Sequence, residues 1–258
     1  MKNIPPIIAA LHLPALLEGE KYSVAEIEDY MCQNLDVFQR GGIPAVILQD
    51  ESRNKGLARI ETVALMASLA RLAKKEFPSL ELGVIIESHD PYTPIAVARA
   101  AGLSFVRIKV FVGAMLKSSG VQEGCGIEAV DYRNKLGGND IMILADVHDR
   151  TGFPLVDVPM EDAAKWASNT GADSLVLTGM TFNESLQILD NVRGKNLNKP
   201  LYIGGSVTIE NVDLALDHAD GAIVSSSLKK TDARDEIVLW DIDLISRFME
   251  KVRNKLKQ

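Results

Sequence analysis

Two ionisable side chains, Asp146 and His148, lie at the end of an apolar run that spans 141–148. Side chains alternate between the two faces of a strand, so Leu144, Asp146 and His148 are predicted to share one face. A carboxylate and an imidazole where a buried strand ends are groups that barrel enzymes use for chemistry. The spacing therefore predicts an acid/base pair at the carboxyl end of this strand.

Seven more short apolar runs resemble this one and alternate with helical patterns. Continuous apolarity is typical of parallel strands covered by helices. The predicted strands are 7–13, 45–50, 82–88, 105–111, 141–148, 174–179, 201–206 and 222–226. The first predicted helix begins at a capping box at Ser23 and ends at Gly41. The other predicted helices are 59–77, 93–101, 128–136, 160–170, 184–193, 209–218 and 241–257.

Eight strand–helix units without a change in composition predict an α/β fold, a single (β/α)8 TIM barrel over residues 1–258. The alternative is a doubly wound open sheet. The glycine-rich fingerprint of a dinucleotide fold is absent after the first strand, where the chain reads Leu13-Pro14. The barrel is therefore the favoured prediction.

Ionisable residues collect at the predicted carboxyl ends of the strands, where barrel active sites form. The candidate catalytic residues are His12, Asp50, Glu87, Lys109, Asp146 and His148. Arg107 and Lys109 share a face that should point inward, and Asp146 on the neighbouring strand is the expected partner of Lys109. This pair would transfer protons, hold a lysine nucleophile, or serve only as an ion pair that fills the lumen.

A divalent metal site is a further alternative. Glu87, Asp50, Asp146 and His148 would be its ligands if they converge, but their spacing in the chain does not fix a geometry. The sequence identifies no other cofactor.

Glycines and serines end the last two predicted strands. Barrels often bind phosphate between the loops after strands seven and eight, through backbone N–H groups. A helix expected directly after Thr208 would add its positive N-terminus. The candidate phosphate-binding residues are Gly204, Gly205, Ser206, Ser225, Ser226 and Ser227.

The composition and hydropathy of the chain limit the classes of molecule that it is expected to bind. A net charge of −7 argues against a nucleic-acid surface. No apolar run approaches the roughly 20 residues of a membrane span, and the first residues lack a signal core. We therefore expect a cytoplasmic protein, either free or peripheral at a membrane, with a phosphorylated small-molecule ligand; a homo-oligomer is left open.

Several segments resemble the BtpA family, in the same order and over nearly the whole chain. They are 11–14 (LHLP), 105–115 (FVRIKVFVGAM), 144–148 (LADVH) and 220–224 (DGAIV). The resemblance implies a TIM barrel of the ribulose-phosphate-binding type. It also implies kinship with a factor in photosystem I accumulation and with a relative encoded among sugar phosphotransferase genes. The chain departs from the usual family residues at Lys109, at Asp50 and at Ser225-Ser226.

Two hypotheses about function follow. The first is an enzyme that acts on a phosphorylated metabolite, such as a sugar-phosphate lyase, isomerase or epimerase, with Asp146 and His148 as acid/base groups and Lys109 at an oxyanion. The second is a non-catalytic biogenesis or regulatory factor that keeps the phosphate pocket. The cluster of ionisable groups at the strand ends favours the enzyme.

Overall fold

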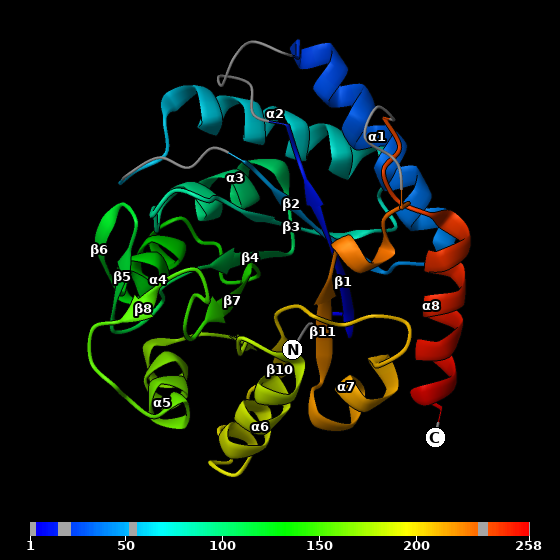
Figure 1. The fold of residues 1–258 in the computed structure, drawn as a ribbon. Helices are drawn as coiled ribbons and strands as arrows, with labels where there is room; N and C mark the ends of the chain where they lie inside the picture. Colours follow the sequence, from blue (N-terminus) through cyan, green and yellow to red (C-terminus); the bar gives the residue numbers. More distant parts are fainter. Residues whose placement is uncertain (1–3, 15–21, 52–55, 232–236, 258) are drawn as a thin grey trace.

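Eight parallel strands close into a barrel in a computed structural model that describes residues 4–14, 22–51, 56–231 and 237–257 (Figure 1). Around the barrel the order is β1-β2-β3-β4-β7-β9-β10-β11, and β11 pairs with β1. These strands are Ile7–His12, Ala45–Gln49, Glu81–Ile85, Phe105–Ile108, Met142–Asp146, Ser174–Leu177, Leu201–Ile203 and Gly221–Val224. The closed parallel barrel confirms the predicted TIM fold and excludes the open sheet.

Helices form the outer ring (Figure 1). They are α1 (Val24–Gly41), α2 (Ile60–Glu76), α3 (Thr93–Ala101), α4 (Gly126–Lys135), α5 (Met160–Thr170), α6 (Phe182–Arg193), α7 (Val212–His218) and α8 (Ile242–Lys255). The capping box predicted at Ser23 is present, because the Ser23 hydroxyl accepts from the Glu26 N–H and Glu26 accepts from the Ser23 N–H. Such local signals fix helix starts well.

Apolar strand side chains fill the lower barrel interior, as the layered cores of TIM barrels require. The interior residues are Ile8, Ala10, Ala45, Ile47, Ile85, Phe105, Leu144, Val176, Tyr202 and Ile223. Two glycines make room for the large rings: a Cβ at Gly83 would lie 2.2 Å from the Phe105 ring, and one at Gly221 would lie 2.4 Å from the Tyr202 ring.

A small antiparallel sheet was not predicted from the sequence. Strands β5 (Ala114–Lys117) and β6 (Gly120–Glu123) form a hairpin after β4, and β8 (Phe153–Pro154) pairs with β5. The sheet lies beside the barrel, next to the loops that follow β4 and β7 (Figure 1). Its strands are too short to give a clear alternating pattern, so the sequence offered little signal.

The described residues include no helix that is both long enough and apolar enough to cross a membrane.

Replacing Gly83 with alanine tests the interior packing. The new methyl group would overlap the buried Phe105 ring, so we expect Gly83→Ala to lower the free energy of unfolding by about 1–3 kcal/mol. Gly194→Ala is the control, because Gly194 is exposed with a φ of −59°. Urea denaturation measures both variants, and equal stability of the two would contradict this account of the interior.

Candidate functional site

A pocket of about 770 Å³ opens at the carboxyl ends of the barrel strands. Each strand contributes the inward-facing residue that lies two positions after an apolar interior residue, because side chains alternate along a strand. These eight residues are His12, Gln49, Glu87, Arg107, Asp146, Thr178, Gly204 and Ser225. The apolar interior therefore ends in one polar layer, which is the floor of the pocket.

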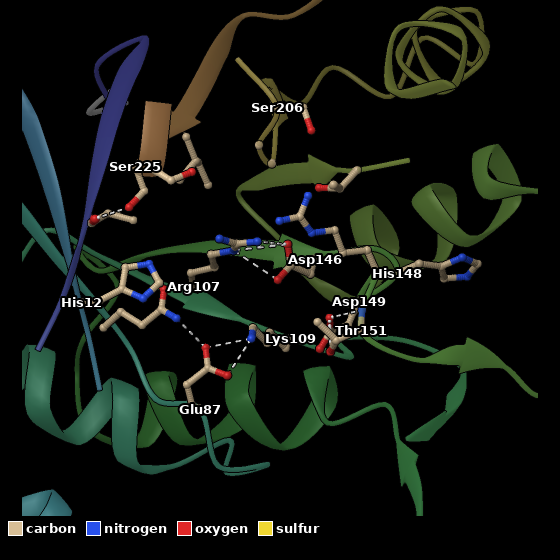
Figure 2. A pocket seen from close by; sticks show the side chains of 18 of the residues that line it. His12, Glu87, Arg107, Lys109, Asp146, His148, Asp149, Thr151, Ser206 and Ser225 are labelled. Atoms are coloured by element: carbon tan, nitrogen blue, oxygen red, sulfur yellow. Dashed lines mark hydrogen bonds and ion pairs between the residues drawn. The ribbon is translucent and has the colours of Figure 1, made fainter. Parts of the chain in front are cut away.

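Arg107 and Asp146 form the most buried ion pair of this layer (Figure 2). The guanidinium donates from Nη2 to Asp146 Oδ1 at 2.9 Å and from Nε to Oδ2 at 3.1 Å. Burial raises the pKa of Asp146, and Arg107 opposes that rise. An arginine does not release its proton in proteins, so this pair is a fixed charge arrangement rather than a proton relay.

Lys109 pairs with Glu87 and not with Asp146, so the predicted partner was wrong. Its Nζ donates to both Glu87 oxygens, at 2.7 and 2.8 Å, and Gln49 Nε2 donates to the same carboxylate at 2.8 Å (Figure 2). Arg107 lies one inward position lower on β4 and occupies both oxygens of Asp146, which leaves Glu87 for the lysine. Beyond Lys109 the chain turns sharply at Val110, whose φ of 47° is rare for a β-branched residue.

A third ion pair joins the β5–β6 hairpin to the loop after β7. Lys117 on the hairpin donates to the carboxylate of Asp149, which also accepts from the N–H and hydroxyl of Thr151. Burial alone would raise the pKa of Asp149, but Lys109, Lys117 and Thr151 outweigh it and lower the pKa to about 2. Both residues line the pocket, and neither was among the residues singled out from the sequence.

The two histidines differ in placement. His12 lines the pocket and its Nδ1 lies 2.5 Å from Glu51 Oε1. His148 borders the pocket, but its ring points away from Asp146 and Lys109 (Figure 2). β7 ends at Asp146, and in the loop that follows it the His148 ring does not lie on the face of Asp146, contrary to the prediction. Burial lowers the pKa of His148, which favours the neutral imidazole.

Asp50 does not line the pocket, contrary to expectation. It is buried just beyond β2, and its Oδ1 accepts the backbone N–H of Glu87 at 2.6 Å. Asp50 thus holds the segment just beyond β3 that contains Glu87. No group of three or more His, Cys, Asp or Glu side chains within the described ranges is arranged to hold a metal ion. The carboxylates of the predicted metal site bind Lys109, Arg107 and a backbone N–H instead.

All six predicted phosphate-binding residues line the side of the pocket opposite Glu87; Figure 2 shows Ser206 and Ser225 there. Gly205 and Ser206 have positive φ values of 152° and 61°. In the described part of the chain, the backbone N–H groups of Gly205, Ser206 and Val207 donate to no other group. The Ser225 hydroxyl donates to the Ala10 carbonyl at 3.0 Å.

The sequence predicted a helix directly after Thr208, but helix α7 begins only at Val212. Asn211 holds the intervening loop by accepting from the Thr208 N–H and donating to the Ser206 carbonyl. A cationic side chain, that of Arg150, lies beside this loop. Arg150 Nη1 lies 3.4 Å from the position that a Cβ on Gly205 would occupy, so its guanidinium faces this loop.

The fold and the site define a (β/α)8 barrel with a charged pocket at its strand ends. The sequence profile described as the BtpA family matches residues 3–254, and the chain belongs to that family. An uncharacterised protein of Pyrococcus furiosus is 29% identical, with 87% of each chain covered. Photosystem I biogenesis protein BtpA of Synechocystis is 24% identical (98% of this chain, 89% of the relative), and the putative sgc region protein SgcQ of Escherichia coli is 26% identical (96% and 94%).

Solved structures of other barrels share the fold at low identity. The native KDPGal structure superposes with a TM-score of 0.65 at 12% identity, covering 100% of this chain and 99% of that one. Phosphoribosyl anthranilate isomerase from Thermococcus kodakaraensis gives a TM-score of 0.58 at 17% identity, covering 97% and 100%. These likenesses establish the architecture and not the reaction.

Asp146→Asn tests the buried ion pair. The variant leaves the Arg107 charge buried without its counter-ion, so we expect a loss of about 3–5 kcal/mol in the free energy of unfolding. Asp140→Asn is the matched control, because Asp140 is exposed and lies 3.8 Å from Arg99. Chemical denaturation at neutral pH gives both values, and a cost for Asp146→Asn no larger than for the control would refute the role of the pair.

The stability of the protein in acid tests the contribution of the Asp149 ion pair to folding. Its pKa in the folded state lies below the ordinary 3.8, so its ion pair stabilises the fold above that pH and is lost as the pH falls towards 2. We expect about 2 kcal/mol of the unfolding free energy to disappear over this range. Asp149→Asn should remove that part of the pH dependence. An unchanged pH profile for the variant, measured by denaturation from pH 5 to pH 2, would contradict it.

Proposed function

We propose that this protein is an enzyme that acts on a phosphorylated small metabolite by proton transfer next to a carbonyl group. One observation carries the proposal: a single pocket has open backbone N–H groups and an arginine on one side, and a lysine–carboxylate pair on the other. The first side suits a phosphate and the second suits acid/base chemistry. Lyase, isomerase and epimerase reactions of sugar phosphates share this proton transfer.

Glu87 and Lys109 are the proposed acid/base pair. Lysine can give up a proton and arginine cannot, so a proton can pass within the Lys109–Glu87 pair but not between Arg107 and Asp146. Glu87 would take the proton from the substrate carbon. The ammonium of Lys109 and the guanidinium of Arg107 would hold the charge that develops on the carbonyl oxygen.

This assignment revises the acid/base roles first given to Asp146 and His148. Asp146 becomes a positioning residue, because the partner of both its oxygens is Arg107, which cannot release a proton, whereas the partner of Glu87 is a lysine, which can. His148 lies at the margin of the pocket with its ring turned away from the pair (Figure 2). His12, beside Glu51, is left as a hydrogen-bonding group on the β1 side of the pocket.

The phosphate would lie at the Gly205–Val207 loop, with Arg150 over it and Ser226 and Ser227 across the gap. Glycine at position 204 is required by close packing, because a Cβ there would lie 1.9 Å from Thr178 Oγ1. The loop therefore lies directly on the polar layer. A phosphate at this loop would lie in the same pocket as Glu87 and Lys109.

A non-catalytic role in biogenesis is the second candidate, because one relative carries the name photosystem I biogenesis protein. A barrel that only docks to a partner has no need of three ion pairs in its pocket, or of an arginine there that pairs with none of the described residues. Burying charges costs free energy, and a pocket without chemistry or ligand would gain nothing from them.

Exchange of substrate protons with D2O tests the proposed reaction. Sugar phosphates that raise the melting temperature would be incubated with the protein in D2O, and NMR would detect loss of the C–H signal next to the carbonyl. Glu87→Gln should slow this exchange by at least about 100-fold and leave phosphate binding in place. Glu128→Gln, an exposed position on α4, is the control.

Two outcomes would refute the proposal. Exchange at the original rate in Glu87→Gln would remove Glu87 as the base. No stabilisation by any phosphorylated metabolite, with a partner protein recovered from cells instead, would favour the biogenesis role.

A further inference from the structure

Most cationic side chains that line the pocket are paired with a carboxylate, and the position of the exception indicates the substrate class. Three of the four described lining lysines and arginines are paired with a lining carboxylate: Arg107 with Asp146, Lys109 with Glu87, and Lys117 with Asp149. The fourth, Arg150, makes no ion pair or hydrogen bond within the described ranges. Among the described lysines and arginines that line the pocket, the excess positive charge therefore lies at the Gly205 loop.

The half of the pocket away from Gly205 has no net charge from these pairs but many hydrogen-bonding groups. Each ion pair presents ammonium or guanidinium donors next to carboxylate acceptors, which matches the dual donor and acceptor character of a hydroxyl group. Neutral polar side chains add to them, namely Gln49, Ser118, Ser119, Gln122 and Thr151. This half suits a ligand rich in hydroxyl groups.

Aromatic side chains are missing from the wall. Among the described residues that line the pocket there is no Phe, Tyr or Trp, and the apolar ones are Ala10, Val207, Ile223 and Val224. Nucleobases and other flat rings are held in proteins by stacking on aromatic faces or in apolar slots. The pocket offers neither to a flat ring.

We propose, resting on the proposed function, that the substrate is an aliphatic polyhydroxy monophosphate: one phosphoryl group, several hydroxyls and a carbonyl, and no second anionic group. Arg150 and the Gly205–Val207 N–H groups take the phosphate. The three ion pairs take the hydroxyls and the carbonyl. Nucleotides, sugar bisphosphates and phosphorylated carboxylic acids are rejected.

The rejection of a second anion follows from the paired charges. A second phosphate or a carboxylate would lie beside Glu87, Asp146 and Asp149 while their cations are already engaged. The repulsion in a partly buried site makes this costly, and breaking a pair would leave a buried carboxylate uncompensated. A neutral hydroxyl meets neither cost.

Isothermal titration of the full-length protein with a matched panel tests the substrate class. The panel is ribose 5-phosphate, glucose 6-phosphate, fructose 1,6-bisphosphate, 6-phosphogluconate, AMP, ribose and inorganic phosphate. We expect ribose 5-phosphate or glucose 6-phosphate, or both, to bind at least tenfold more tightly than the other members of the panel. Those are fructose 1,6-bisphosphate, 6-phosphogluconate, AMP, ribose and inorganic phosphate.

Two variants connect the preference to the charges. Arg150→Gln should reduce the affinity for the monophosphate at least tenfold, while Arg247→Gln on the exposed side of α8 should leave it unchanged. Asp149→Asn frees Lys117, so it should bring the bisphosphate and the phosphorylated acid closer to the monophosphate in affinity. A role of Asp149 in folding alone would not produce this gain, and a melting curve confirms that the variant is folded.

The possible outcomes test the substrate class, the proposed function and the phosphate site separately. If the bisphosphate, the phosphorylated acid or AMP binds as tightly as the monophosphates, the substrate class proposed here is wrong but a phosphorylated metabolite remains the ligand. If no phosphorylated compound binds, the proposed function itself fails. If Arg150→Gln binds the monophosphate normally, the phosphate does not lie at the Gly205 loop.

Discussion

The buried contact between Arg107 and Asp146 closes the boundary between the apolar interior and the pocket above it. Phe105 and Leu144, two positions lower on the same strands, belong to the apolar interior. A charge at this depth is tolerated only when it is compensated, and the guanidinium and carboxylate compensate each other through parallel hydrogen bonds. Arg107 occupies these two oxygens, and Lys109, the next inward residue after Arg107, pairs with Glu87 instead.

The same layer explains how one barrel can hold two chemically different half-sites. On the β3, β4 and β7 side, paired charges provide donors and acceptors at no net charge. On the β10 and β11 side, the N–H groups of the Gly205–Val207 loop have no acceptor in the described part of the chain, and Arg150 adds a cation that pairs with none of the described residues. For the proposed substrate, the second half would hold the anion and the first half the neutral polar groups. This division would orient the molecule before any residue acts on it.

Predictions based on the chain alone succeeded where the signal was local or periodic. Eight apolar runs, the capping box at Ser23 and the glycines after α1, α3 and α5 gave the barrel and its helices. The two-residue period also placed Glu87, Arg107 and Lys109 at the pocket. The errors lie in the loops: the ring of His148, in the loop after β7, turns away from Asp146, and the short hairpin that carries Lys117 has too few residues to show a pattern.

The sequence by itself therefore determined the class of fold, the family, and the layer in which the ionisable residues lie, because alternation along a strand is a property of the backbone. The tertiary structure alone decided which charges meet. Partner choice depends on the register between neighbouring strands and on side-chain length, so Arg107 reaches Asp146 and Lys109 is left with Glu87. It also depends on loops that fold back over the mouth, which bring Asp149 to Lys117 and Arg150 to Gly205.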